Sequence, residues 1–312
     1  MRLCFLIGTC CFLATLAHAQ TPPLPPGIPL TTATVSVMVN YDPGKDIFTY
    51  SYSLSNSKQS VGKIDSFYLD ISTISGGAAL GSSGLINSAT GYSGLGTMGT
   101  LPGKVANATV TVGFESQPTG WDSGPTAQLT AGWFPGPHGD YINPGQSLSG
   151  FVLTSHGLPG VRHFSAEPAY DPDDFISGGI DDPPANMTAQ QVVDLDNAIQ
   201  RAIKSQGVTI GPVSPPSTTD AGSLVGWLAS LKHQAADLGW IFGPGADGIV
   251  QSLDAKLAAA SASIASGDSK TAANQLSAFI NEVQAQRGKH VNDDACYLLT
   301  ANAQYILTRL GP

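Results

Sequence analysis

The chain has 312 residues, of which 12% are charged, and it combines a formal net charge of -9 with 36 glycines and 22 prolines. An acidic composition with no cluster of Lys and Arg argues against nucleic acids and anionic membranes as partners, because both are bound through basic side chains. After the N-terminal segment no apolar stretch of about 18 residues or more follows, so we expect no transmembrane helix in the mature chain.

The first 19 residues have the three parts of a signal peptide. Arg2 supplies the positive charge, residues 3–16 are apolar, and Ala17-His18-Ala19 is a cleavage site of the small-x-small type before Gln20. An uncleaved membrane anchor is the alternative, but this apolar run is shorter than the ~20 residues that cross a bilayer. We therefore expect residues 1–19 to be removed and the mature chain to be secreted, into the periplasm, outside the cell or onto its surface.

The cysteines fit export without an internal disulfide. Three of the four lie in the leader, namely Cys4, Cys10 and Cys11. Lipid attachment to the second or third of these would need a lipobox, and the residues before them form a poor one. Cys296 remains alone in the mature chain, within a helical pattern, so we expect it to be a buried apolar residue. Asp293 and Asp294 place the wrong charge beside it for a reactive thiolate.

Residues 31–166 carry the pattern of an antiparallel, immunoglobulin-like β-sandwich, preceded by a Pro-rich, extended arm at residues 20–30. The clearest strand is residues 48–54, where Phe, Tyr and Leu alternate with Thr and Ser. Similar short runs, separated by Gly, Pro and Asn, are typical of an all-β domain, and they occur at residues 35–39, 67–71, 110–114 and 148–153. The Gly- and Ser-rich residues 75–103 predict an irregular loop.

Residues 167–220 form a connecting region that contains one expected helix. Apolar residues recur at helical spacing over about 188–205, and Thr188 is a suitable N-cap. The Gly- and Pro-rich residues 211–216 then predict a linker.

Residues 222–310 predict a small antiparallel bundle of four helices, so the fold class is multidomain, β followed by α. The pattern is broken at Gly243-Pro244-Gly245, Gly267 and Gly288, and Asp268 is a suitable N-cap. Each helix has one apolar face and one polar face, so the four helices are expected to bury their apolar faces against each other.

This helical segment resembles the FIMAH domain through residues 252–257 (SLDAKL), 272–276 (AANQL) and 279–283 (FINEV), together with an Ala- and Leu-rich closing helix. The FIMAH domain is a small all-helical module near the C-terminus of secreted bacterial proteins. The resemblance implies export and an accessory, interactive role, and it implies no chemistry.

Residues 34–165 are similar to secreted β-sandwich domains that occur beside surface-sorting signals in bacteria. The similar residues are 48–52 (FTYSY), 118–121 (PTGW) and 142–151 (INPGQSLSGF). The chain departs from those proteins at its end, where Gly311-Pro312 follows without a hydrophobic helix or an Arg tail. Covalent surface sorting is therefore not expected.

No sequence motif indicates a catalytic centre, a metal site or a cofactor. The chain has no G-x-S-x-G elbow, no H-E-x-x-H pair and no phosphate-binding G-x-x-x-x-G-K-[ST] loop. The histidines of the mature chain do not have metal-ligand spacing: His138, His156, His163, His233 and His290. His156 and His163 flank Pro159 and could meet in space, but a loop histidine is more often solvated.

Acidic residues offer two weaker possibilities. Glycoside hydrolysis needs two carboxylates that face each other across a cleft, and the sequence cannot pair those of the sandwich, which are Asp42, Asp46, Asp65, Asp70, Glu115, Asp122 and Asp140. Most of them lie in expected turns, where Asp is favoured anyway. Residues 171–182 are rich in Asp and could bind Ca²⁺, but their spacing is not that of an EF-hand, and a solvated linker is the preferred interpretation.

Four aromatic residues are the best candidates for ligand binding: Trp121, Trp133, Phe134 and Tyr141. We expect them in loops of the sandwich, where an aromatic ring can stack on a sugar or anchor a protein partner. The preferred alternative is that they cover the ends of the core. Trp227 and Trp240 belong to the helical segment and are expected to be packing residues.

These features predict a secreted, non-catalytic binding or structural protein of the cell surface or extracellular space. Its partner would be an extracellular protein or a glycan, and no enzyme activity is expected. The alternative is a carbohydrate-binding or weakly carbohydrate-active protein that uses the loops of the sandwich.

Overall fold

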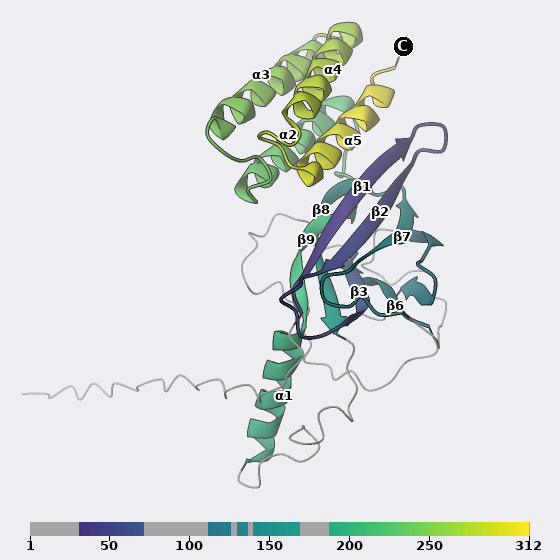
Figure 1. Ribbon diagram of the computed structural model, residues 1–312. Coiled ribbons are helices and arrows are strands. Elements are labelled where there is room, and N and C mark those ends of the chain that lie inside the picture. The colour runs from purple at the N-terminus through teal and green to yellow at the C-terminus, as the bar shows by residue number, and fades with distance from the viewer. Residues whose placement is uncertain (1–30, 72–111, 126–129, 137–139, 169–186, 312) are drawn as a thin grey trace, which may run out of the picture.

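The computed structural model describes residues 31–71, 112–125, 130–136, 140–168 and 187–311. Within these ranges, two antiparallel sheets pack together in the N-terminal part and four helices form the C-terminal part (Figure 1). The fold class predicted from the sequence is confirmed. The expected signal peptide, the Pro-rich arm, the loop at residues 75–103 and the acidic segment at residues 171–182 lie outside the described residues.

The strands form one four-stranded and one five-stranded sheet. The first sheet has the order β1-β2-β7-β4, with bounds β1 Ala33–Asp42, β2 Ile47–Asn56, β7 Ser147–Ser155 and β4 Val112–Ser116. The second has the order β5-β6-β3-β8-β9, with bounds β5 Trp121–Pro125, β6 Thr130–Pro135, β3 Ile64–Asp70, β8 Leu158–Pro168 and β9 Ser205–Val213. All strand pairs are antiparallel.

The alternation along β2 produces the core of the sandwich, as the sequence predicts. Phe, Tyr and Leu side chains of β2 are buried, whereas the intervening Thr and Ser side chains are partly exposed. Opposite them, Phe67 stacks on Trp133 with ring centroids 5.2 Å apart, and Phe151 meets both rings edge-on at 5.7 and 5.9 Å. One face of β2 therefore fills the space between the sheets, and its other face is partly exposed.

β9 corrects the first half of the linker predicted at residues 211–216, because residues 205–213 form an edge strand that pairs with β8, whereas residues 214–216 lie outside it. Two glycines of this strand are required by packing. A Cβ atom on Gly207 would lie 2.6 Å from Cε1 of Phe164, and one on Gly211 would lie 2.9 Å from Cδ2 of Leu69. Glycine in this strand thus marks a close approach of neighbouring side chains.

The connecting helix is present where the sequence predicts it. α1 spans Ala189–Ile203, and Thr188 caps it in a reciprocal arrangement with Gln191. Its buried residues Leu195, Ile199 and Ile203 pack together with Met187. The end of this helix is tied to the start of the sandwich, because Oγ1 of Thr31 donates to the Ile203 carbonyl at 2.9 Å.

The four C-terminal helices are α2 Ala221–Asp237, α3 Ala246–Ala265, α4 Ser269–Gln286 and α5 Asp293–Arg309. Side chains of Asp220, Asp268 and Asn292 accept backbone N–H groups at the starts of α2, α4 and α5, which confirms the predicted cap at Asp268. Each helix buries an apolar stripe, and Cys296 is buried on α5 as predicted.

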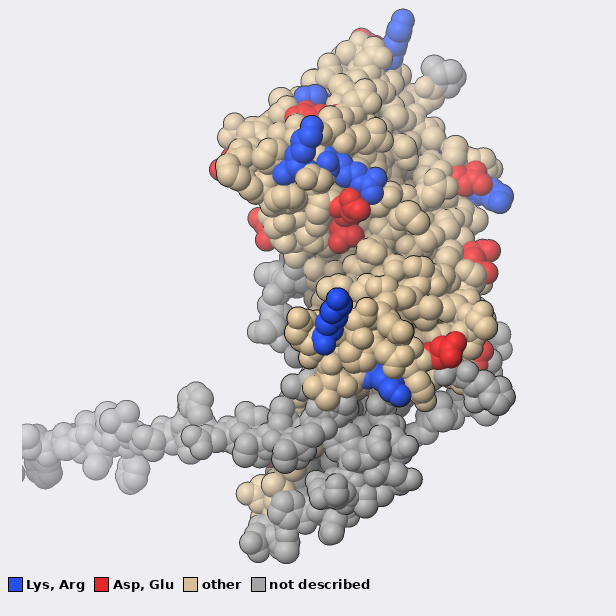
Figure 2. Space-filling model, viewed as in Figure 1, with Lys and Arg blue, Asp and Glu red and all other residues tan. Residues whose placement is uncertain are grey.

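The helices and the sandwich share one continuous apolar core. α5 packs against β1 and touches β8 and β9, so it covers one end of the sandwich (Figure 1). The face shown in Figure 2 is mostly uncharged, with basic and acidic side chains next to each other on the helical part. No helix among the described residues is long and apolar enough to cross a bilayer.

Candidate functional site

Three of the four candidate aromatic residues are in strands and not in loops. Trp121 begins β5, and Trp133 and Phe134 lie in β6. Trp121 is 3% exposed and Trp133 is fully buried, so their rings belong to the core, whereas Phe134 is half-buried. Tyr141 lies outside the strands and is 44% exposed. The prediction of loop positions was wrong for all but Tyr141, because Gly and Pro flank β5 and β6 in the sequence.

The segment that carries Tyr141 is fixed to the turn after β2 by a buried asparagine. Asn56 is 2% exposed, and its Nδ2 donates to the carbonyl oxygens of Gly62 and Ile142, at 2.9 Å each. Its backbone pairs with Gln146 and Gly145, again at 2.9 Å. One side chain therefore holds two surface segments, residues 57–63 and 140–146, in a single arrangement.

These two segments carry two lysines, of which Lys63 lies against Tyr141 and Lys58 against Gly145. Nζ of Lys63 lies 5.5 Å from the centre of the Tyr141 ring, which is within cation–π range. Lys58 lies over Gly145, since a Cβ atom on this glycine would be 3.0 Å from Cγ of the lysine. Both lysines are exposed. We call Lys58, Lys63 and Tyr141 the Tyr141 tip.

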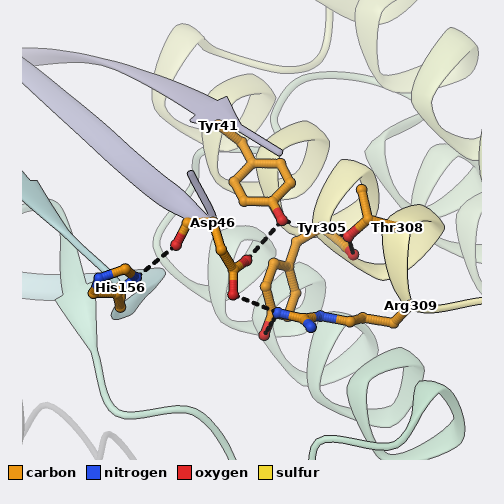
Figure 3. A network of polar contacts seen from close by, with 6 residues as sticks. All are labelled: Tyr41, Asp46, His156, Tyr305, Thr308 and Arg309. Atoms are coloured by element: carbon orange, nitrogen blue, oxygen red, sulfur yellow. Dashed lines mark hydrogen bonds and ion pairs between the residues drawn. The ribbon is translucent and has the colours of Figure 1, made fainter. Parts of the chain in front are cut away.

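A second cluster joins the sandwich to α5, and we call it the junction (Figure 3). Asp46 lies in the turn between β1 and β2 with a φ of 55°, a conformation that Asp tolerates better than most residues. Its carboxylate accepts from the Tyr41 hydroxyl at 2.8 Å and from the Arg309 guanidinium at 2.7 Å. Its carbonyl oxygen lies 2.7 Å from Nδ1 of His156. The turn is thus bound to both the last helix and the neighbouring strand end.

Aromatic packing accompanies these polar contacts at the junction. The ring of Tyr305 lies 5.5 Å from that of Tyr41 and 5.7 Å from that of Phe48, and Arg309 stacks on Tyr305 at 4.6 Å. Deeper in the contact, Nδ2 of Asn302 donates to the backbone carbonyl of Pro159 at 2.8 Å. Residues of α5 therefore insert into the end of the sandwich.

The electrostatics of the junction follow from these contacts. Partial burial acts to raise the pKa of Asp46, but the hydrogen bonds from Tyr41 and Arg309 outweigh it, so the pKa falls below its ordinary value. Burial raises the pKa of Tyr41. The junction is consequently an ionised carboxylate between a neutral phenol and a cation, which is a structural contact and not an acid–base pair.

Two of the ion pairs in the helical part join successive helices. Lys232 of α2 is fully buried, and its Nζ lies 2.5 Å from Oδ1 of Asp254 on α3. Lys256 of α3 lies 2.5 Å from Glu282 of α4, which also accepts from Ser252 at 3.0 Å. These contacts tie α2 to α3 and α3 to α4.

Of the histidines singled out in the sequence, His138 lies outside the described residues. His156 contacts Asp46 as described, and His163 is exposed on β8 opposite Val208. Asp65 accepts from the Ser66 hydroxyl, and burial raises its pKa to about 6, with a further contribution from Glu167. Within the described ranges, no group of three or more His, Cys, Asp or Glu side chains could hold a metal ion.

Sequence reasoning did not identify Asn56, Lys58, Lys63, Asn302 or Arg309. No local signal in the sequence links Asp46, in the turn between β1 and β2, to Arg309. Lys58 and Lys63 are an equally ordinary surface pattern in the sequence. These residues acquire their roles only from partners that are distant in the sequence.

The helical part matches a known family. Residues 243–308 match the FIMAH domain, which confirms the resemblance predicted from residues 252–283. No curated protein matches the chain. The match covers α3, α4 and nearly all of α5, and it begins after α2. The chain therefore contains a FIMAH domain at residues 243–308, joined through α5 to two packed antiparallel sheets.

Proposed function

We propose that the protein is exported and acts outside the cytoplasm as a non-catalytic binding or structural protein, with the sandwich and the FIMAH domain as one rigid unit. The junction is the observation that carries this proposal. A domain that merely hangs from a linker makes few contacts with its neighbour, whereas α5 shares a core with the sandwich.

The contacts at the junction support a fixed orientation. Tyr305 is 8% exposed and packs against both Tyr41 and Phe48, and Asn302 makes a buried hydrogen bond to Pro159. Separating the two parts would expose these rings and leave a buried carbonyl without its donor, which costs free energy. A fixed FIMAH domain enlarges the surface that one partner can contact, as suits an adhesive or structural protein.

Export is supported by the N-terminal sequence and by the occurrence of FIMAH domains in secreted bacterial proteins. The basic residue Arg2, the apolar residues 3–16 and the small residues Ala17 and Ala19 together form the signal-peptide pattern. The uncharged, Ser- and Thr-rich outer side of β2 suits a chain that stays in aqueous surroundings.

Cell fractionation tests the export part of the proposal. The full chain, expressed in a bacterial host, is expected in the exported fraction with Gln20 as its new N-terminus, as read by N-terminal sequencing. Leu6→Arg should keep the chain unprocessed inside the cell, because it places a charge in the apolar run, whereas Leu6→Ile should be exported normally. An unprocessed cytoplasmic wild-type chain would contradict the proposal.

Carbohydrate recognition is a second candidate function, and the exposure of Tyr141 favours it. Of the four candidate aromatic residues, Tyr141 alone is exposed enough to offer much of its ring to a ligand. Incubation of the mature chain with polysaccharides separates binding from hydrolysis, since only hydrolysis releases new reducing ends. Such release, with a time course proportional to protein concentration, would overturn the non-catalytic proposal.

A further inference from the structure

The Tyr141 tip is basic, whereas the chain as a whole is acidic. The sequence holds 23 acidic and 14 basic residues, yet residues 57–63 and 140–146 together carry two lysines, Lys63 against Tyr141 and Lys58 against Gly145. The ion pairs among the described residues involve other basic side chains, so Lys58 and Lys63 keep their charges available in this part of the molecule. Asp140 is exposed next to Tyr141 and offsets one of the two charges. The tip therefore keeps a net positive charge.

The tip is also preorganised. Asn56 binds both segments that form it, and Ile64 and Ile142 exchange two backbone hydrogen bonds of 2.9 and 3.0 Å directly beneath. Gly145 has a φ of +80°, which lets the chain turn under the stem of Lys58. Because these segments are already ordered, binding of a ligand does not cost the free energy of ordering them. A surface site can therefore still bind its ligand.

The location of the tip leaves it free of the FIMAH domain. Asp46, which binds Arg309 of α5, immediately precedes β2 at one end of the strand. The segment that carries Lys58 follows β2 at its other end. A ten-residue strand spans about 30 Å, so the two ends of β2 present separate surfaces. A partner at the tip would meet the sandwich alone.

We infer that the Tyr141 tip binds acidic polysaccharides, that is, chains of sugars that carry carboxylate groups. This inference deepens the carbohydrate-recognition candidate and rests on the proposed binding function. An aromatic ring packs on the apolar face of a sugar, and the two ammonium groups pair with carboxylates along the same polysaccharide chain. Duplex nucleic acids fit less well, because their phosphate charge is denser than one carboxylate per sugar and the protein has a formal net charge of -9.

Calorimetric titration of mature chain, residues 20–312, with polygalacturonate tests the inference, with fully methyl-esterified polygalacturonate as the uncharged match. Polygalacturonate is expected to bind, and the ester should bind at least fivefold more weakly. Tyr141→Ala should weaken binding by about five- to tenfold. Lys58→Gln and Lys63→Gln should each weaken it by about two- to fivefold, with a smaller salt dependence. Lys289→Gln, an exposed lysine of the helical part, should leave binding unchanged.

Three outcomes would overturn the inference: no binding of polygalacturonate, equal binding of both polymers, or unaltered binding by the three tip variants. Binding of a single-stranded oligonucleotide with equal affinity would replace it with non-specific attraction of polyanions. Thermal melting of each variant shows whether it is folded, and the lysines are exposed enough for substitution to be tolerated. None of these outcomes touches the export proposal, which fails only if fractionation finds the chain unprocessed in the cytoplasm.

Discussion

Asn302 of α5 and Pro159 of β8 are joined by a buried hydrogen bond of 2.8 Å that crosses between the helices and the sandwich. The same Nδ2 also donates to the Leu298 carbonyl within the helix. Asn302→Ala would leave the Pro159 carbonyl without a donor, so we expect it to lower the free energy of unfolding by about 1–3 kcal/mol. Urea denaturation of residues 20–312, followed by circular dichroism, measures the change.

Asn281→Ala is the matched control for this prediction, since Asn281 is an exposed asparagine on α4. It should change the free energy of unfolding by no more than about 0.5 kcal/mol. If the two variants were equally stable, the contact with Pro159 would contribute nothing to the union of the two parts.

Trp133 should matter for stability and not for ligand contact. Its ring is fully buried between Phe67 and Phe151. Trp133→Ala is expected to cost about 3–5 kcal/mol because it opens a cavity in the core. Trp133→Phe should cost less, since the indole Nε1 has no hydrogen-bond partner to lose. Thermal melts compare both with Tyr141→Ala, which should unfold close to the wild-type temperature. A Trp133→Ala protein of wild-type stability would contradict this view of the core.

The FIMAH match begins at residue 243, but the folded unit should include α2. α2 buries Leu224, Leu228 and Leu231 against the other helices, and Lys232 reaches Asp254 from it. Residues 217–312 are therefore expected to melt cooperatively by circular dichroism, whereas residues 243–312 should show a broad, non-cooperative change because an apolar groove is left open. Equal melting of both fragments would place the boundary of the unit after α2.

Asp65 should make stability depend on pH. Burial and the nearby Glu167 raise the pKa of Asp65 in the folded state to about 6, against an ordinary value of 3.8. The folded state thus holds the proton more tightly, so this contribution is fully present below pH ~4 and is lost as the pH rises through about 6. Asp65→Asn cannot ionise and so does not lose this contribution. Its free energy of unfolding minus that of the wild type should be about 1–2 kcal/mol larger at pH 8 than at pH 4.

Urea denaturation at both pH values measures this difference, and comparison of variant with wild type cancels the titration of all other groups. Asp140→Asn serves as the control, because Asp140 is exposed. A difference between Asp65→Asn and wild type that is the same at pH 4 and pH 8 would show that Asp65 does not titrate abnormally in the folded protein.

The helices were the most predictable part of the fold. Their signals are local, since an apolar stripe repeats every three to four residues and a capping side chain marks the start. Asp268 and Thr188 are caps in both the sequence prediction and the structure. The alternation along β2 is equally local, and the buried and half-exposed positions follow it.

The missed features depend on distant partners. Gly207 and Gly211 look like linker residues until Phe164 and Leu69 are known to lie against them. The junction pairs Asp46 with Arg309 across 263 residues, and no pattern at either position indicates the other. The burial of Trp133 likewise depends on the sheet that faces it, so sequence periodicity could not separate a core ring from an exposed one.

β1 lies at the edge of its sheet, so it can pair with other chains until later parts of the protein cover it. β1 is made early in synthesis, but its outer side meets β9 and α5, which are made much later, α5 being the last element of the chain. An unprotected edge strand is a template for pairing with other chains. Until Ser205 has reached the Ala33 amide and α5 has docked, a nascent or partly folded chain therefore presents this edge to its neighbours. Loss of α5 would therefore also expose the edge of the sandwich and make it prone to self-association.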